Sequence, residues 1–78
     1  MAVRLTADQR QRLRRERERA GLTQVELAER LGFVSQHVNM IENGKKAPSL
    51  ETLQRLGSEL GLEITVETIV SIKRKRRN

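Results

Sequence analysis

The chain contains no cysteine, tryptophan or tyrosine, and Phe33 is its single aromatic residue. Without cysteine it can form neither disulfide bonds nor a thiolate zinc site, and its one histidine, His37, cannot hold a metal ion alone. The scarcity of aromatic side chains disfavours RNA and single-stranded nucleic acids, which proteins bind by stacking bases on aromatic rings. The core must therefore consist of leucine, isoleucine, valine and alanine.

The sequence also lacks the features of an enzyme, a metalloprotein or a membrane protein. It has no long apolar run that could span a membrane and no segment typical of a secretory signal. It contains no nucleophile–base set, no cluster of metal ligands and no glycine-rich phosphate loop. The absence of cysteine fits a reducing compartment. We therefore expect a cytoplasmic binding protein without a catalytic site, a cofactor or a metal ion.

Positive charge is abundant but unevenly distributed. The net charge is +6, yet the run Lys73-Arg74-Lys75-Arg76-Arg77 supplies five positive charges and leaves only +1 for the rest of the chain. A basic balance suits nucleic acid or an anionic surface. Because residues 73–78 include no apolar side chain, we expect a disordered basic tail. This tail would either add non-specific affinity for DNA or serve solubility alone.

The spacing of apolar and capping residues predicts four helices. Thr6 with Gln9 and Thr23 with Glu26 are capping-box sequences, which mark the starts of the first two helices. Ser49, which follows the only proline, is the expected N-cap of the last helix. Glycines follow the expected ends of all four. The pattern predicts helices over residues 7–20, 24–31, 35–43 and 50–60.

The hydrophobic period changes after residue 61. Leu62, Ile64 and Val66 alternate with polar residues, which is typical of a β-strand. A lone strand needs a partner, and we see no turn leading to a second clear strand. The partner is expected to be either residues 3–5 or the same strand of a second copy. The expected organisation is a helical domain, a dimerisation strand and a tail, over residues 1–61, 62–72 and 73–78.

The segment from about residue 12 to residue 61 resembles the Xre-type helix-turn-helix proteins, which are related to the phage lambda-type repressors. The resemblance implies a mainly α, four-helix lambda-repressor-like domain with a C-terminal β-strand paired across a dimer. It also implies binding to a two-fold-related operator in double-stranded DNA, with the third helix in the major groove. The matching segments are Leu22-Thr23-Gln24, Glu26-Leu27-Ala28, Leu31-Gly32, Ile41-Glu42-Asn43-Gly44, Pro48-Ser49-Leu50 and Leu56 to Leu60-Gly61.

The third helix has one polar face that could read bases. Helical spacing places Ser35, Gln36, Asn39 and Met40 together, opposite the apolar Val38 and Ile41. Gln and Asn can pair with adenine, and Met can contact a thymine methyl group. A polar face of this kind can also be merely solvated. Within the surrounding motif we expect these four side chains to contact bases.

Residues at the start of the second helix, within the third helix and after it are expected to contact phosphates. The start of the second helix offers backbone N–H groups to an anion, and the resemblance implies a phosphate contact there from Gln24. The loop after the third helix carries two lysines, which could instead be simply solvated. The expected phosphate contacts are Thr23, Gln24, His37, Asn43, Lys45 and Lys46.

The resemblance further implies an ion pair between Arg17 and Glu42, which would tie the first helix to the third. The sequence departs from the family pattern at Val34, where an N-cap serine or threonine is usual, so Ser35 is expected to cap the third helix instead. Val25 is apolar where polar residues are typical, which could mark a contact surface.

The strand after the fourth helix is similar to that of the Hip-type antitoxin subunits, whose strands pair across a dimer that binds a kinase-like toxin. This similarity implies a homodimer held by Leu62, Ile64 and Val66. The expected function is that of an autoregulating repressor and antitoxin subunit. The alternative is a stand-alone phage or mobile-element repressor without a toxin, and a neighbouring toxin gene would distinguish the two.

Overall fold

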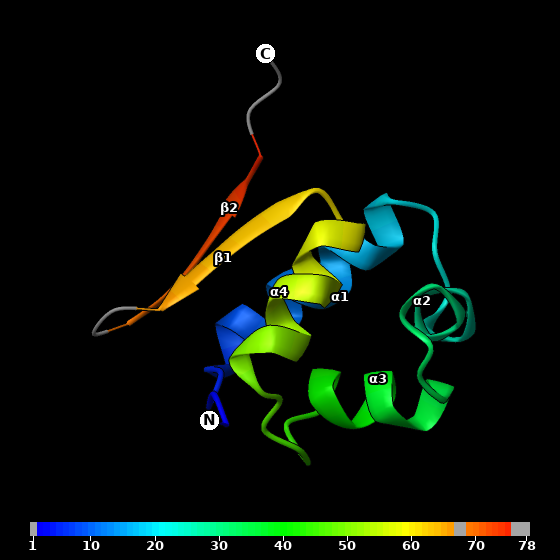
Figure 1. Cartoon of the computed structure of the whole chain (residues 1–78), viewed down its shortest axis with the longest axis horizontal. Helices are drawn as coiled ribbons and strands as arrows, with labels where there is room; N and C mark the ends of the chain where they lie inside the picture. Colours follow the sequence, from blue (N-terminus) through cyan, green and yellow to red (C-terminus); the bar gives the residue numbers. More distant parts are fainter. Residues whose placement is uncertain (1, 67–68, 76–78) are drawn as a thin grey trace.

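The computed structural model describes residues 2–66 and 69–75. Four helices come first, and two antiparallel strands follow (Figure 1). The mainly helical fold and the strand after the fourth helix are therefore confirmed. The elements are α1 (Ala7–Arg19), α2 (Gln24–Leu31), α3 (Ser35–Glu42), α4 (Leu50–Glu59), β1 (Leu62–Val66) and β2 (Val70–Arg74).

Side-chain caps start three of the four helices. Thr6 and Thr23 form complete capping boxes at α1 and α2, and the Ser49 hydroxyl accepts the Thr52 N–H at α4. The expectation that Ser35 caps α3 is wrong, because Val34 is the N-cap and Ser35 is already helical. Val34 has extended backbone geometry and makes no side-chain cap bond. The eight-residue α3 therefore depends on tertiary packing for its stability.

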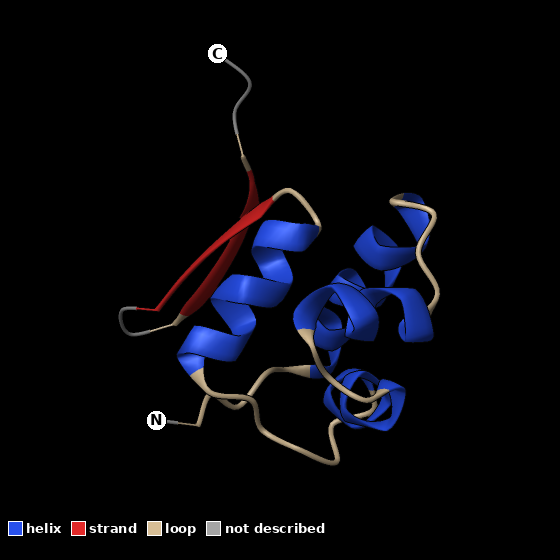
Figure 2. Cartoon of the chain, turned by 45° about the vertical axis from the view of Figure 1, so that its right-hand side comes forward, coloured by secondary structure: helices blue, strands red, loops and turns tan. Residues whose placement is uncertain are grey.

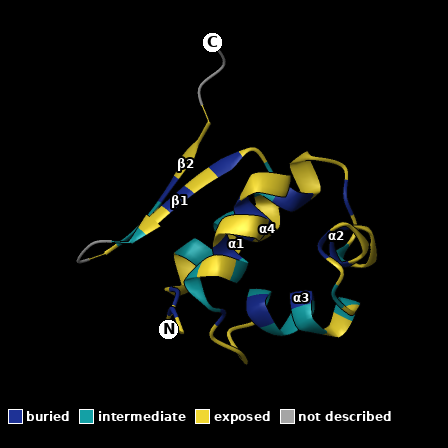
Figure 3. Ribbon diagram, in the orientation of Figure 1, coloured by how far each residue is buried: buried dark blue, intermediate teal, exposed yellow. Residues whose placement is uncertain are grey.

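The buried residues form one core between the helices and the hairpin (Figure 3). α1 is thinly apolar, and Leu13 is its one buried hydrophobic residue. The N-terminal Val3 and Leu5 are buried against the same core, since Val3 N–H donates to Pro48 O over 2.6 Å. The largest fully buried side chains of the core are Leu13, Leu27, Val38, Ile41, Leu53, Leu56 and Leu62.

The C-terminal strand has a partner in its own chain, which corrects two expectations. β1 pairs antiparallel with β2, and Ile64 lies opposite Ile72. The N-terminal segment instead meets the loop before α4, where Ala2 bridges Ser49. β2 forms because Ile72 continues the buried face of the sheet. Residues 3–5 are thus not the partner of β1, and β1 does not depend on a second copy for pairing.

The expected tail boundary at residue 73 is also wrong. Lys73 and Arg74 belong to β2, and Lys75 N–H donates to Gly61 O over 2.9 Å. Both side chains are exposed, so these residues keep their charges in water while their backbone pairs with β1. Residues 76–78 of the expected tail lie outside the described part of the chain.

The hairpin packs against α4 through β1 and bonds to α1 through β2, and it lies along one side of the helices (Figure 2). Gly57 of α4 permits close approach, since a Cβ built there would lie 2.9 Å from Ile64 Cδ1. From α1, Gln9 donates to Val70 O and Arg12 donates to Ile72 O. These bonds cover the outer edge of β2. No helix within residues 2–66 and 69–75 is long and apolar enough to cross a membrane.

Candidate nucleic-acid interface

A tight turn joins α2 to α3. Gly32 ends α2 with φ +73°, a left-handed conformation that strains residues with a Cβ. Phe33 N–H then donates to Ala28 O over 2.8 Å, which closes the turn. Ala28 is 1% exposed, and its small side chain lets the two helices approach each other. The result is a rigid helix–turn–helix unit.

The buried face of α3 fixes its outward face. Val38 and Ile41 are fully buried, whereas Gln36 is exposed on the other side of the helix. Ser35, Asn39 and Met40 are half-buried around it. The structure thus brings the four expected base-contacting residues together on one face. Their contacts with bases remain a prediction.

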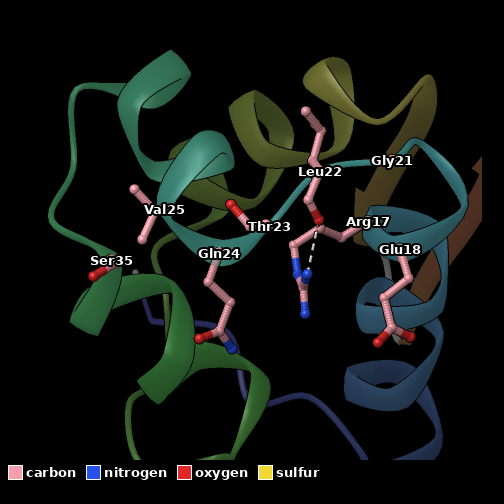
Figure 4. A pocket seen from close by; sticks show the side chains of 8 residues that line it. All are labelled: Arg17, Glu18, Gly21, Leu22, Thr23, Gln24, Val25 and Ser35. Carbon is pink, nitrogen blue, oxygen red and sulfur yellow. Dashed lines mark hydrogen bonds between the residues drawn. The ribbon is translucent and has the colours of Figure 1, made fainter.

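The ion pair expected between Arg17 and Glu42 is present. Arg17 Nε and Nη2 donate to the two Glu42 carboxylate oxygens over 2.7 and 3.0 Å, a bidentate geometry. The remaining nitrogen, Nη1, donates to Leu22 O over 2.8 Å (Figure 4). The side chains are only 9% and 4% exposed. The hydrogen bond to Glu42 raises the pKa of Arg17 above its ordinary value, although burial opposes the charge.

A chain of amide side chains connects this ion pair to the outward face of α3. Gln24 Nε2 donates to Glu42 Oε1 over 3.1 Å, and Asn39 Nδ2 donates to Gln24 Oε1 over 3.3 Å. Asn43 in turn donates to Asn39 Oδ1 over 3.1 Å. Each amide retains a free N–H and free lone pairs for a ligand. The sequence did not reveal this network, because its members come from two helices and a loop.

Figure 4 shows a shallow pocket at the start of α2, and Gln24 and Arg17 are among the side chains that line it. Thr23 is exposed, and its hydroxyl already accepts the Glu26 N–H as a cap. Ser35 of α3 borders the same surface, together with Val25. Val25 is 52% exposed, so its apolar side chain is available for contact with another molecule. The start of α2 and the start of α3 thus form one continuous surface.

Comparison with known proteins identifies the family. A family model described as Helix-turn-helix matches residues 13–66, more than half of the chain. The chain belongs to the helix-turn-helix family. It is 43% identical over 51 residues to an uncharacterized HTH-type transcriptional regulator of Methanothermobacter thermautotrophicus, covering 65% of this chain and 74% of that protein. A second such regulator, from Sinorhizobium fredii, shares 43% identity over 51 residues, covering 65% of this chain and 62% of its own length.

Membership of the helix-turn-helix family makes this a DNA-binding protein and not an enzyme. In such a protein the second helix of the motif, here α3, enters the major groove. The residues on its outward face stay predicted base contacts. This agrees with the geometry of α2 and α3 described above.

His37 sits at the rim of the helix-turn-helix surface. Its ring stacks on Phe33 with centroids 4.6 Å apart, and the Arg55 guanidinium lies 5.3 Å from the centre of the Phe33 ring. Burial lowers the pKa of His37, and the nearby charge of Lys46 lowers it further. Both effects favour the neutral imidazole in the free protein. The contact of His37 with phosphate stays a prediction.

The loop after α3 presents the remaining expected phosphate contacts. Asn43, Lys45 and Lys46 are all exposed. Lys45 N–H donates to Met40 O over 2.9 Å, which holds the loop against the end of α3. No ion pair within residues 2–66 and 69–75 involves either lysine. Their contacts with phosphate stay a prediction.

Proposed function

We propose that the protein is a sequence-specific transcriptional repressor of the cytoplasm that acts as a homodimer on a two-fold-related operator near its own gene. The observation that carries the proposal is the construction of α3. Val38 and Ile41 fix the helix in the core, and Gln36 and Asn39 face outward with hydrogen-bonding capacity for base edges. The names of the two relatives, both HTH-type transcriptional regulators, support the same role.

The proposed homodimer follows from the size of the reading surface. One α3 meets only a few base pairs, whereas two copies place their recognition helices about 34 Å apart, one turn of DNA. Leu62, Ile64 and Val66 were expected to hold the dimer, but the first two are 1% and 3% exposed in the core of their own chain and Val66 is half-buried. Dimerisation through this segment must therefore use the β1 backbone.

The hairpin register defines the free edge of β1. The bond from Lys75 N–H to Gly61 O, continued along the register, makes Glu63–Lys73 and Thr65–Ser71 the hydrogen-bonded pairs. The backbone groups of Ile64 then point away from β2, and no residue within 2–66 and 69–75 bonds to them. The outer edge of β2 is covered by α1, and at Leu62 the outer edge of β1 faces Gly57 of α4. The part of the β1 edge left for pairing therefore begins at Ile64. A second β1 pairing there would complete a four-stranded sheet.

The antitoxin role with a kinase-like toxin is a second candidate. It is favoured by Ile69, a large apolar side chain that is 74% exposed beside the hairpin and suited to contact with a protein. It is weakened by the hairpin itself, because the similarity to Hip-type subunits concerned a lone strand paired across a dimer. A toxin gene beside this one and co-purification of its product would favour this candidate. Their absence would favour the stand-alone repressor.

The experiment that tests the proposed function is a footprint on the DNA upstream of the gene. We expect protection of two half-sites related by a two-fold axis, with centres about 10 base pairs or a multiple of this apart. Protection of a single half-site would contradict the dimer. No protection at any upstream position would contradict autoregulation.

A further inference from the structure

A positively charged surface lies at the C-terminal end of α3, between the N-terminal segment, α1 and the loop that follows α3. It is a hollow of about 480 Å³. Four cationic side chains line it and no acidic side chain does, while Leu5, Ile41 and Pro48 supply apolar walls. The four cations are Arg4, Arg10, Lys45 and Lys46. We call this hollow the basic pocket.

Arg10 is built into the basic pocket and is not a freely moving surface side chain. A Cβ built on Gly44 would lie 2.5 Å from Arg10 Nη1, so the guanidinium occupies the space above that glycine. Gly44 also has φ +75°, which independently disfavours a residue with a Cβ. Arg10 Nε is buried and donates to no acceptor within the described residues. The guanidinium is thus held in place without its charge or its hydrogen-bonding capacity being satisfied by the described residues.

The charge of the basic pocket is not neutralised by the protein. The ion pairs of residues 2–66 and 69–75 use Arg14, Arg17, Arg30 and Arg74, and none uses a cation of the pocket. Arg10 also lies close to the N-terminus of α1, whose dipole disfavours a positive charge there. Four like charges around one hollow, with an unused buried donor among them, are suited to an anion.

The position of the basic pocket indicates which anion. α3, the loop after it and the N-terminal segment all lie along the lower side of the molecule in Figures 1 and 2. A duplex read by α3 would therefore bring its backbone to this side. Thr23 and Gln24 lie at the start of α2, so phosphate contacts from α2 and from the basic pocket would together fix the register of α3.

We propose that the basic pocket binds a phosphodiester of the DNA backbone, with Arg10 as its central ligand and Arg4 as a second. This inference rests on the proposed function, and it extends the interface to α1 and the N-terminal segment. Neither arginine was expected from the sequence to contact DNA. The contact would be independent of sequence, because phosphates are the same at every base pair.

The test compares Arg10→Gln with Arg15→Gln over a range of salt concentrations. Arg15 is an exposed residue of the same helix that makes no ion pair in the described part of the chain, so its variant has the same charge change. We expect Arg10→Gln to weaken binding to operator and random duplexes by the same factor. The slope of log affinity against log salt should become shallower by about 0.9 for the lost phosphate. Equal slopes for the two variants would overturn the proposal.

Further variants make the outcome decisive. Arg4→Gln, at an exposed position, should shift the slope in the same direction without affecting folding. Inorganic phosphate, titrated into the free protein, tests a free anion as occupant. If Arg10→Gln abolishes phosphate binding but leaves the affinity for DNA unchanged, the pocket serves a free anion and the proposal fails. If Gln36→Ala loses operator preference while Arg10→Gln has no effect, the proposed function stands and only the pocket assignment falls.

Discussion

At the scale of single residues, the fold withdraws Arg17 and Glu42 almost completely from water. Such charges are tolerated only when each is paired and hydrogen-bonded, and the three guanidinium nitrogens of Arg17 all donate within the protein. Because Glu42 also accepts from Gln24, the pair supports a side chain at the DNA-facing surface. One ion pair therefore both fastens α1 to α3 and positions part of the interface.

Breaking this pair from one side should destabilise the protein more than replacing both partners. We expect Arg17→Met alone to cost about 3–5 kcal/mol, because Glu42 is left buried and unpaired. The double variant Arg17→Met, Glu42→Leu should recover part of that loss. Urea unfolding of the wild type, both single variants and the double variant measures the coupling. A coupling near zero would show that the two charges act independently.

His37 should make stability depend on pH. Its pKa in the folded protein is lowered from the ordinary 6.5 by burial and by Lys46, so the unfolded chain takes up a proton more readily. The stabilisation is thus complete above pH 6.5 and is lost as the pH falls through the folded-state value. Urea midpoints of the wild type and His37→Gln at pH 7 and pH 5 test this. The wild type should lose more stability than the variant, and equal losses would contradict the assignment.

The resemblance implied one contact between helices, the Arg17–Glu42 pair, but the residues alone revealed only which side chains share a face of one helix. Spacing along α3 was enough to place Gln36 and Asn39 together, because helical period alone determines it. The bond between Asn39 and Gln24 and the position of Arg10 over Gly44 depend on how helices are oriented in three dimensions. No local pattern encodes these contacts, so the sequence did not show them.

At the scale of elements, local signals predicted the helices well and the hairpin poorly. Thr6, Thr23 and Ser49 cap helices where expected, since a capping bond forms within a few residues of sequence. The second strand was missed because the sequence between the strands has no Asn-Gly or Asp-Gly turn. β2 also ends in basic residues that read as a tail. Its pairing is dictated by the burial of Ile72, a tertiary effect.

The free edge of β1 can be tested with proline. The Val66 N–H points away from β2, by the same alternation that applies to Ile64. Val66→Pro removes this donor without breaking the hairpin, because proline is tolerated where the N–H faces outward. We expect Val66→Pro to sediment as a monomer at micromolar concentration, whereas Val66→Ala remains dimeric. A dimeric proline variant would show that the copies associate elsewhere.

At the scale of the whole molecule, the placement of charge matches the requirements of a DNA reader. α3 presents few charges of its own, and cationic side chains gather beyond its C-terminal end. Base contacts in the middle would provide specificity, while phosphate contacts around them would provide position and affinity. Two such surfaces related by a two-fold axis would extend the site to a full operator.

The central claim is that α3 reads the bases, and Gln36 is its most exposed test position. The measurement is the affinity of the wild type and Gln36→Ala for the footprinted operator and for a random duplex of the same length at one salt concentration. Loss of a bidentate base contact should cost about 1–3 kcal/mol on the operator and little on random DNA. Equal losses on the two duplexes would contradict the assignment of α3 as the reading helix.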